Sequence, residues 1–290
     1  MRNVIVHVGF PKTGTTTLQR YLFSRLQGIE YWGKEVESTQ FDALNDFIFE
    51  NDEGVLNTNL LSQEKDTLLI SNEDYTHPKV ATSLFSVATD LGKLYPDAKI
   101  IIVIRNQLDF VKSWFNAGFE HSSVSFSEFI ANFSDSILYK SGALNYDEIV
   151  YKYQEVFGVQ SVKVIPFELL KFDPNVFYAE ISETIGLDKD EVLSLVSGKH
   201  TNHPKSTLYL FVKKIYESSL GRFVNINSLL PGSLLLFLKN FIRKIGQPAH
   251  VEYTDNQLKR IHDSYAASNI RLSNMLKSDL KKFNYPMGGL

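Results

Sequence analysis

Short apolar runs alternate along the chain with segments whose apolar residues recur at helical spacing. Four of these runs predict buried strands, at residues 4–8, 67–70, 99–104 and 162–166, because strands covered on both faces are apolar throughout. Helical spacing predicts helices from about residue 15 to 29 and near 41–49, 80–95, 108–119, 146–157 and 177–185. Strands that alternate with helices predict an α/β fold with a P-loop-like parallel sheet flanked by helices.

The remainder of the chain has no strand pattern and is predicted to be helical from about Thr207 onward. No linker interrupts the sequence, so we expect one domain over residues 1–290, with an α/β core at 1–205 and a helical C-terminal part at 206–290. This part is a candidate lid over the acceptor cleft or a homodimer contact. Its most apolar stretch, 223–242, contains a Pro-Gly pair and Lys239, which makes it a poor membrane-spanning helix. A core helix, a lid or an amphipathic helix lying on a surface fits better, and peripheral membrane contact is not favoured.

Composition narrows the class of protein only a little. The chain of 290 residues is 43% hydrophobic and 22% charged, with a net charge of −3, which is ordinary for a globular protein and gives no overall attraction to nucleic acid. It has no cysteine, so it forms no disulfide and no thiolate metal site, and a reducing, cytoplasmic location is expected. No secretory signal is expected in residues 1–8, which are too short for one.

The clearest chemical signal is the loop between the first strand and the first helix. Gly9 and Gly14 are four residues apart, which is the glycine spacing of a phosphate-binding loop. Glycine allows the backbone to approach an anion closely, and the following helix start adds N–H groups and a positive dipole end. Three threonines, Thr15, Thr16 and Thr17, add hydroxyl groups.

The position of the lysine separates this loop from that of nucleoside triphosphatases. In those proteins lysine directly follows the second glycine, but here Thr15 follows it and the lysine is Lys12. The apolar strand at 99–104 ends in Arg105, where a triphosphatase is expected to carry an aspartate for magnesium. Ser113 follows Arg105 by eight residues, two turns into the next helix, so both can reach one anion.

These motifs resemble those of the sulfotransferase superfamily. Residues 11–16, Pro-Lys-Thr-Gly-Thr-Thr, resemble its 5′-phosphosulfate loop, and Arg105 with Ser113 resembles its 3′-phosphate site. The resemblance covers about residues 4–205 and implies 3′-phosphoadenosine 5′-phosphosulfate as donor, with adenosine 3′,5′-bisphosphate as product and no metal requirement. It further implies that Lys12 contacts the bridging oxygen and that residues 13–17 (Thr13, Gly14, Thr15, Thr16 and Thr17) bind the 5′-phosphate.

Two later segments resemble the family more weakly. Phe167 stands where the family places an aromatic residue beside the adenine, although a purely structural core position explains it equally well. Lys199 and Asn202 fall where related enzymes close a basic loop over the 3′-phosphate, and a plain surface loop is the alternative. His200 and His203 lie three residues apart without a third ligand, which is more typical of a polar loop than of a metal site.

Transfer of a sulfuryl group to a hydroxyl also needs a base that removes the hydroxyl proton. Glu73, just after the strand at 67–70, is the leading candidate because ligands bind at the carboxyl ends of parallel strands. Glu35 and Glu37 are the alternatives, since their distance from Lys12 resembles that of the glutamate base in heparan-type sulfotransferases. In this interpretation the chain sulfates a small-molecule or glycan acceptor, favoured to be a carbohydrate or glycolipid, by in-line displacement.

Two other functions stay open at the level of sequence. A P-loop nucleotide kinase or hydrolase would share the glycine spacing, but it needs magnesium and a triphosphate. A non-catalytic relative could keep the fold as a binding module, although every donor-contacting residue type that the resemblance implies is present.

Overall fold

The structure is a computed structural model that describes residues 2–50, 54, 65–77, 84–117, 125–198 and 251–288. The chain divides into two compact units. The first comprises residues 1–108, 137–201 and 261–290, and the second comprises residues 109–136 and 202–260. The predicted single domain over 1–290 remains a prediction, and Lys199 and Asn202 lie outside the described residues.

The first unit is built on a five-stranded parallel sheet. Its strand order is β2 (Ile29–Gly33), β3 (Thr67–Ser71), β1 (Asn3–His7), β4 (Lys99–Ile104) and β5 (Val162–Pro166). The inner strands are apolar because both faces are covered, and the side chains from Ile100 to Ile104 are fully buried. The predicted α/β fold with a parallel sheet is confirmed.

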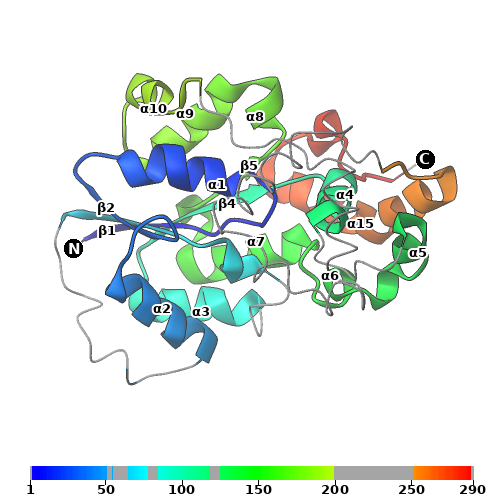
Figure 1. Ribbon diagram of the computed structural model, residues 1–290, viewed down its shortest axis with the longest axis horizontal. Coiled ribbons are helices and arrows are strands. Elements are labelled where there is room, and N and C mark those ends of the chain that lie inside the picture. The colour runs from blue at the N-terminus through cyan, green and yellow to red at the C-terminus, as the bar shows by residue number, and fades with distance from the viewer. Residues whose placement is uncertain are drawn as a thin grey trace, which may run out of the picture. The chain divides into compact units, whose positions relative to one another are not determined.

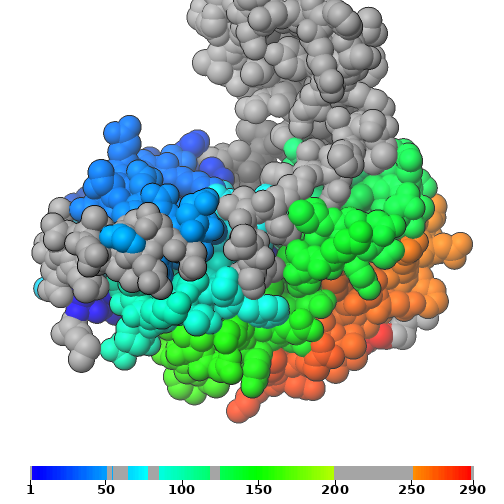
Figure 2. All heavy atoms as spheres, turned by 90° about the horizontal axis from the view of Figure 1, so that it is seen from below, coloured from blue at the N-terminus to red at the C-terminus, as the bar shows by residue number. Residues whose placement is uncertain are grey.

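Helices cover both faces of this sheet (Figure 1). One face carries the helical segment that begins with α1 (Thr15–Thr17), together with α9 (Pro174–Ile185) and α10 (Lys189–Val196). The other face carries α2 (Thr39–Glu50), α3 (Leu84–Leu94) and α7 (Tyr146–Phe157). Figure 2 shows this second face, with α2 in blue, α3 in cyan and α7 in green. Shorter and later elements of the unit are α6 (Ile137–Lys140), α8 (Leu169–Phe172) and most of α15 (Asp255–Leu276).

Strand β2 differs from the sequence prediction, which assigned Ile29 to the end of the first helix. That helix is irregular: after α1 it continues as a π-helical turn, Leu18–Leu22, and a 3-10 turn, Phe23–Arg25. Gly28 then takes a left-handed conformation with φ of 73°, which reverses the chain and starts the edge strand. The spacing of the apolar residues continued past the point where the helix ends.

The described part of the second unit is an aromatic cluster around α4 (Gln107–Ala117), most of which lies in this unit, and α5 (Phe126–Ala131). Phe115 packs against Phe126 and Phe129, with ring centroids 5.2 and 5.5 Å apart. The Lys112 ammonium lies 4.9 Å from the centre of the Tyr253 ring. Ser113 lies half-buried on α4. Among the described helices, none is long and apolar enough to pass through a membrane.

Candidate functional site

The loop from Gly9 to Gly14 adopts a strained backbone. Gly14 has φ of 80° and Lys12, a residue with a side chain, has φ of 70°. A side chain in the left-handed region is uncommon and costs free energy, so such residues gather at binding sites. The loop that follows the carboxyl end of β1 thus keeps a backbone conformation that Lys12 would not favour by itself.

Three carbonyl oxygens of this loop accept hydrogen bonds from side chains of the protein. Thr76 Oγ1 donates to the Gly9 carbonyl at 2.7 Å, and Thr13 Oγ1 donates to the Phe10 carbonyl at 2.6 Å. Arg105 Nη1 donates to the Lys12 carbonyl at 2.9 Å. Because carbonyl oxygens repel anions, engaging them with donors of the protein favours a loop that presents its N–H groups to a phosphate.

The predicted threonines do not share one environment. Thr13, Thr15 and Thr17 are buried, and Thr16 is exposed. Thr15 Oγ1 also donates to the Phe10 carbonyl, at 3.1 Å, so the hydroxyl hydrogens of Thr13 and Thr15 brace the loop from inside. Their contribution to binding the 5′-phosphate stays a prediction.

Arg105 and Phe167 meet at the same loop. The guanidinium carbon of Arg105 lies 5.1 Å from the centre of the Phe167 ring, a cation–π contact. A β-carbon placed on Gly14 would lie 2.9 Å from Cε2 of Phe167, so the aromatic ring packs directly on the loop. One cluster therefore contains three features that were predicted from the sequence to bind the donor: the loop, Arg105 and Phe167.

The Arg105 guanidinium retains hydrogen-bonding capacity. Its Nε is buried and has no hydrogen-bond partner among the described residues. An arginine without a partner for a buried N–H is costly in a folded protein unless a ligand satisfies it. This orphaned donor, beside a glycine cradle that a β-carbon would fill, fits an anionic group.

Glu73 lies in the 3-10 turn Glu73–Thr76 that follows β3, and Thr76 of the same turn bonds to Gly9. Lys34 Nζ lies 3.2 Å from Glu73 Oε1 and 2.7 Å from Asp74 Oδ2. Oε2 of Glu73 is buried without a partner among the described residues. One carboxylate oxygen is thus fixed by an ion pair, while the other is left without a hydrogen bond among the described residues.

The alternative bases lie after β2 and are placed differently. Both oxygens of Glu35 accept hydrogen bonds from Arg20, at 3.1 and 3.3 Å. Glu37 is exposed and lines a pocket of about 790 Å³ beside β2. Neither carboxylate lies in the turn that is bonded to the loop.

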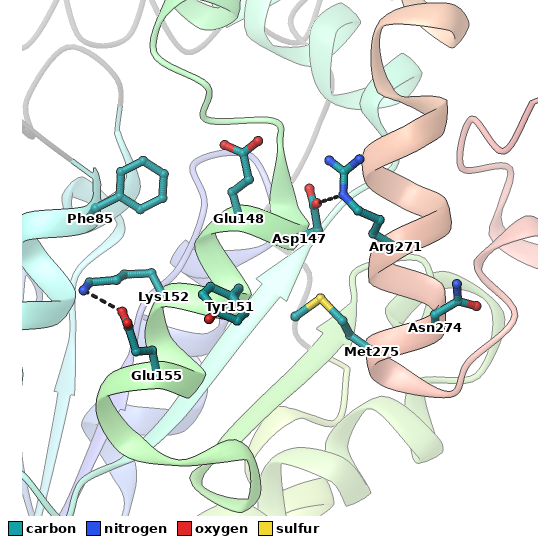
Figure 3. A pocket seen from close by; sticks show the side chains of 9 residues that line it. All are labelled: Phe85, Asp147, Glu148, Tyr151, Lys152, Glu155, Arg271, Asn274 and Met275. Atoms are coloured by element: carbon teal, nitrogen blue, oxygen red, sulfur yellow. Dashed lines mark hydrogen bonds and ion pairs between the residues drawn. The ribbon is translucent and has the colours of Figure 1, made fainter.

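A second pocket, of about 600 Å³, lies between α3, α7 and α15 (Figure 3). Two ion pairs lie on its wall: Arg271 Nε lies 2.5 Å from Asp147 Oδ2, and Lys152 Nζ lies 2.8 Å from Glu155 Oε2. None of the residues predicted for the site lines this pocket.

Several contacts of the site were not foreseen in the sequence. Buried His7 holds Ser71 with its Nδ1 2.8 Å from Ser71 Oγ, and burial lowers the pKa of His7 to about 3. Gln19 Nε2 donates to the same Ser71 hydroxyl at 3.1 Å. Tyr146 donates to the Arg105 carbonyl at 2.7 Å. His7 and Ser71 could have been selected because they lie at the ends of predicted strands. No feature of the sequence distinguishes Gln19 or Tyr146 as a residue of the site.

The fold and the loop define an α/β protein with a candidate anion site at the carboxyl edge of a parallel sheet. The family model described as the sulfotransferase domain matches residues 4–160, which is more than half of the chain. The chain therefore belongs to the sulfotransferase family and is an enzyme of that class. The predicted family is confirmed.

Solved structures show the same fold at low identity. The crystal structure of a sulfotransferase from Alicyclobacillus acidocaldarius is 18% identical, with a TM-score of 0.59, and the match covers 98% of this chain and 99% of that one. The mouse sulfotransferase SULT7A1 complexed with PAP is 16% identical, with a TM-score of 0.52, and the match covers 97% of this chain and 89% of that one. A search among curated proteins gives no match.

Proposed function

We propose that the chain transfers a sulfuryl group from 3′-phosphoadenosine 5′-phosphosulfate to a hydroxyl of a small-molecule or glycan acceptor. The observation that carries this proposal is the contact of Arg105 with both the Lys12 carbonyl, at 2.9 Å, and the Phe167 ring, at 5.1 Å. These contacts unite the parts that the family uses for the two phosphates and the adenine. Support also comes from the similar mouse enzyme, whose structure contains PAP.

The donor supplies the sulfuryl group and leaves as adenosine 3′,5′-bisphosphate. The Lys12 ammonium neutralises charge that develops on the departing 5′-phosphate, and residues 13–17 bind its oxygens. Arg105, with Ser113 as its proposed partner, holds the 3′-phosphate, and Phe167 packs beside the adenine. Lys199 and Asn202 are proposed to close over the 3′-phosphate.

Glu73 is proposed as the base that takes the proton of the acceptor hydroxyl. The buried and unpartnered Oε2, with Oε1 held by Lys34, supports Glu73 over Glu35, whose two oxygens are already bonded to Arg20. The Glu73→Gln variant should lose about 100-fold or more in turnover while it binds the bisphosphate normally. The matched Glu35→Gln variant should keep its activity, and the reverse result would move the base to Glu35.

Calorimetry with adenosine 3′,5′-bisphosphate tests the donor site. Hydrogen bonds to charged groups contribute about 2 kcal/mol, so Arg105→Ala should weaken binding about 30-fold. Lys12→Ala should weaken binding as well. Arg25, whose guanidinium carbon lies 5.4 Å from the centre of the Tyr21 ring, provides a matched control, since Arg25→Ala removes an arginine that also rests on an aromatic ring. Normal binding by both Arg105→Ala and Lys12→Ala would falsify the assignment.

The acceptor and the need for metal are settled by activity measurements. The proposed acceptor is a carbohydrate or glycolipid, and labelled donor with a panel of sugars, glycolipids, phenols and peptides shows which class gains mass. We expect sulfation to continue in EDTA, because the donor has no β,γ-diphosphate for a metal to bridge. Binding of ATP that depends on magnesium, without binding of the bisphosphate, would contradict the proposed donor.

A further inference from the structure

A buried carboxylate lies next to the proposed 3′-phosphate site. Glu168, which follows Phe167, has only 3% of its surface exposed. Its Oε1 accepts hydrogen bonds from the Asn106 backbone N–H at 2.9 Å and from Asn106 Nδ2 at 3.0 Å. Its Oε2 accepts one from the Tyr285 hydroxyl at 3.2 Å. The carboxylate is therefore bonded to the residue that directly follows Arg105.

These hydrogen bonds favour the charged form of Glu168. Three donors converge on its two oxygens, and an ionised carboxylate is an acceptor at every lone pair. Burial raises the pKa of Glu168 above its usual value, while the Arg105 charge acts in the opposite direction. A neutral glutamine could accept both bonds from Asn106, so the hydrogen bonds alone do not explain why a negative charge stands here.

A negative charge close to Arg105 reduces the attraction of that arginine for a phosphate. The 3′-phosphate is the same in the donor and in the bisphosphate product, so contacts with the 3′-phosphate stabilise the bound donor and the bound product equally. Such uniform binding does not lower the barrier of the transfer step. Excess affinity there would slow the departure of the product, because the tighter complex dissociates more slowly.

We propose that Glu168 is an affinity-setting residue whose negative charge weakens the hold of Arg105 on the nucleotide 3′-phosphate. The proposal rests on the donor site proposed above. Through Asn106, the same carboxylate also fixes the backbone beside Arg105, so that the guanidinium stays in place while its positive potential is lowered. Tyr285 brings the C-terminal segment into this arrangement.

Glu168→Gln separates this role from a structural one. Its amide oxygen can still accept from Asn106 and its NH₂ can donate to Tyr285, while the charge is lost. We expect the variant to bind adenosine 3′,5′-bisphosphate about fivefold more tightly, or about 1 kcal/mol, and adenosine 5′-phosphate with unchanged affinity. A purely structural Glu168 predicts weaker binding of both nucleotides.

The control is Glu183→Gln, which removes the same charge from a carboxylate that is 73% exposed and paired with Lys163. It should leave both affinities unchanged. Tyr285→Phe provides a second variant in case Glu168→Gln does not fold. It keeps the charge and removes one donor that offsets it, so the bisphosphate should bind about twofold more weakly and adenosine 5′-phosphate equally well.

Comparison of the two nucleotides also separates failure of this inference from failure of the donor site. If the wild-type chain binds them equally, the proposed 3′-phosphate site is wrong and the inference falls with it. If the wild-type chain prefers the bisphosphate, and Glu168→Gln fails to increase that preference, only the inference is overturned. If Glu168→Gln does not fold, the test rests on Tyr285→Phe. The inference is then overturned if Tyr285→Phe keeps or increases the preference for the bisphosphate over adenosine 5′-phosphate.

Discussion

Replacement of Gly14 by alanine tests whether Phe167 and the loop act as one binding surface. Gly14 has φ of 80°, and a β-carbon there would lie 2.9 Å from Phe167 Cε2, about half an ångström closer than ordinary contact. The left-handed backbone costs an alanine about 1 to 2 kcal/mol. Displacement of the ring also weakens the Arg105 cation–π contact, which contributes about 1 kcal/mol.

Gly186 offers the matched control, because it has φ of 76° and nothing within 4 Å of a built β-carbon. It ends α9, far along the chain from the loop. Gly186→Ala and Gly14→Ala should both lower the melting temperature, by about 3 °C for each kcal/mol. Gly14→Ala alone should also weaken bisphosphate binding, by about fivefold.

Thermal melts and calorimetry on the two variants distinguish backbone strain from damage to the site. Equal affinities of Gly14→Ala and wild type would show that the ring can move without loss, and would refute the reasoning. The same conclusion would follow if Gly186→Ala weakened binding as much as Gly14→Ala.

Three further predictions concern stability and loop order. Burial lowers the pKa of His7 in the folded chain to about 3, below its ordinary value of 6.5. The unfolded chain therefore binds the extra proton, and stability is lost as pH falls from 6.5 toward 3. Melts of His7→Gln should show a shallower pH slope than wild type. Thr76→Val removes the 2.7 Å bond to Gly9 and should weaken bisphosphate binding about fivefold, and calorimetry with unchanged affinity would contradict this. Arg271→Met leaves Asp147 without its ion pair and should lower the free energy of unfolding, measured in urea titrations, by about 1 kcal/mol. The loss is small because the Arg271 side chain is half-exposed and solvent screens the pair.

The strands of the core could be predicted from hydrophobicity because burial on both faces requires it. Lys99–Ile104 and Val162–Pro166 were predicted with the bounds that the structure shows. Strand β2 was missed because Ile29–Gly33 lies at the sheet edge, where residues such as Glu30 remain partly exposed and interrupt the apolar run.

The segments of the candidate site could be predicted from sequence, but its bonds could not. Arg105 was selected from its place at a strand end, Lys12 from the loop that follows the first strand, and Phe167 from its resemblance to the family's adenine-binding segment. All three follow parallel strands, whose carboxyl ends lie at one edge of the sheet. The bonds from Thr76 to Gly9 and from Asn106 to Glu168 join residues 67 and 62 positions apart. Hydrogen bonds between residues so far apart in the sequence depend on the tertiary structure, which a local sequence pattern does not predict.

The bonds to the loop carbonyls also limit how the loop can be transplanted. Its shape depends on Thr76 and Arg105, which stand 67 and 93 positions away from the carbonyls they bind. A graft of residues 9–17 into another α/β scaffold would carry the sequence without the two side chains that orient its backbone. The portable module is the loop together with the ends of β3 and β4.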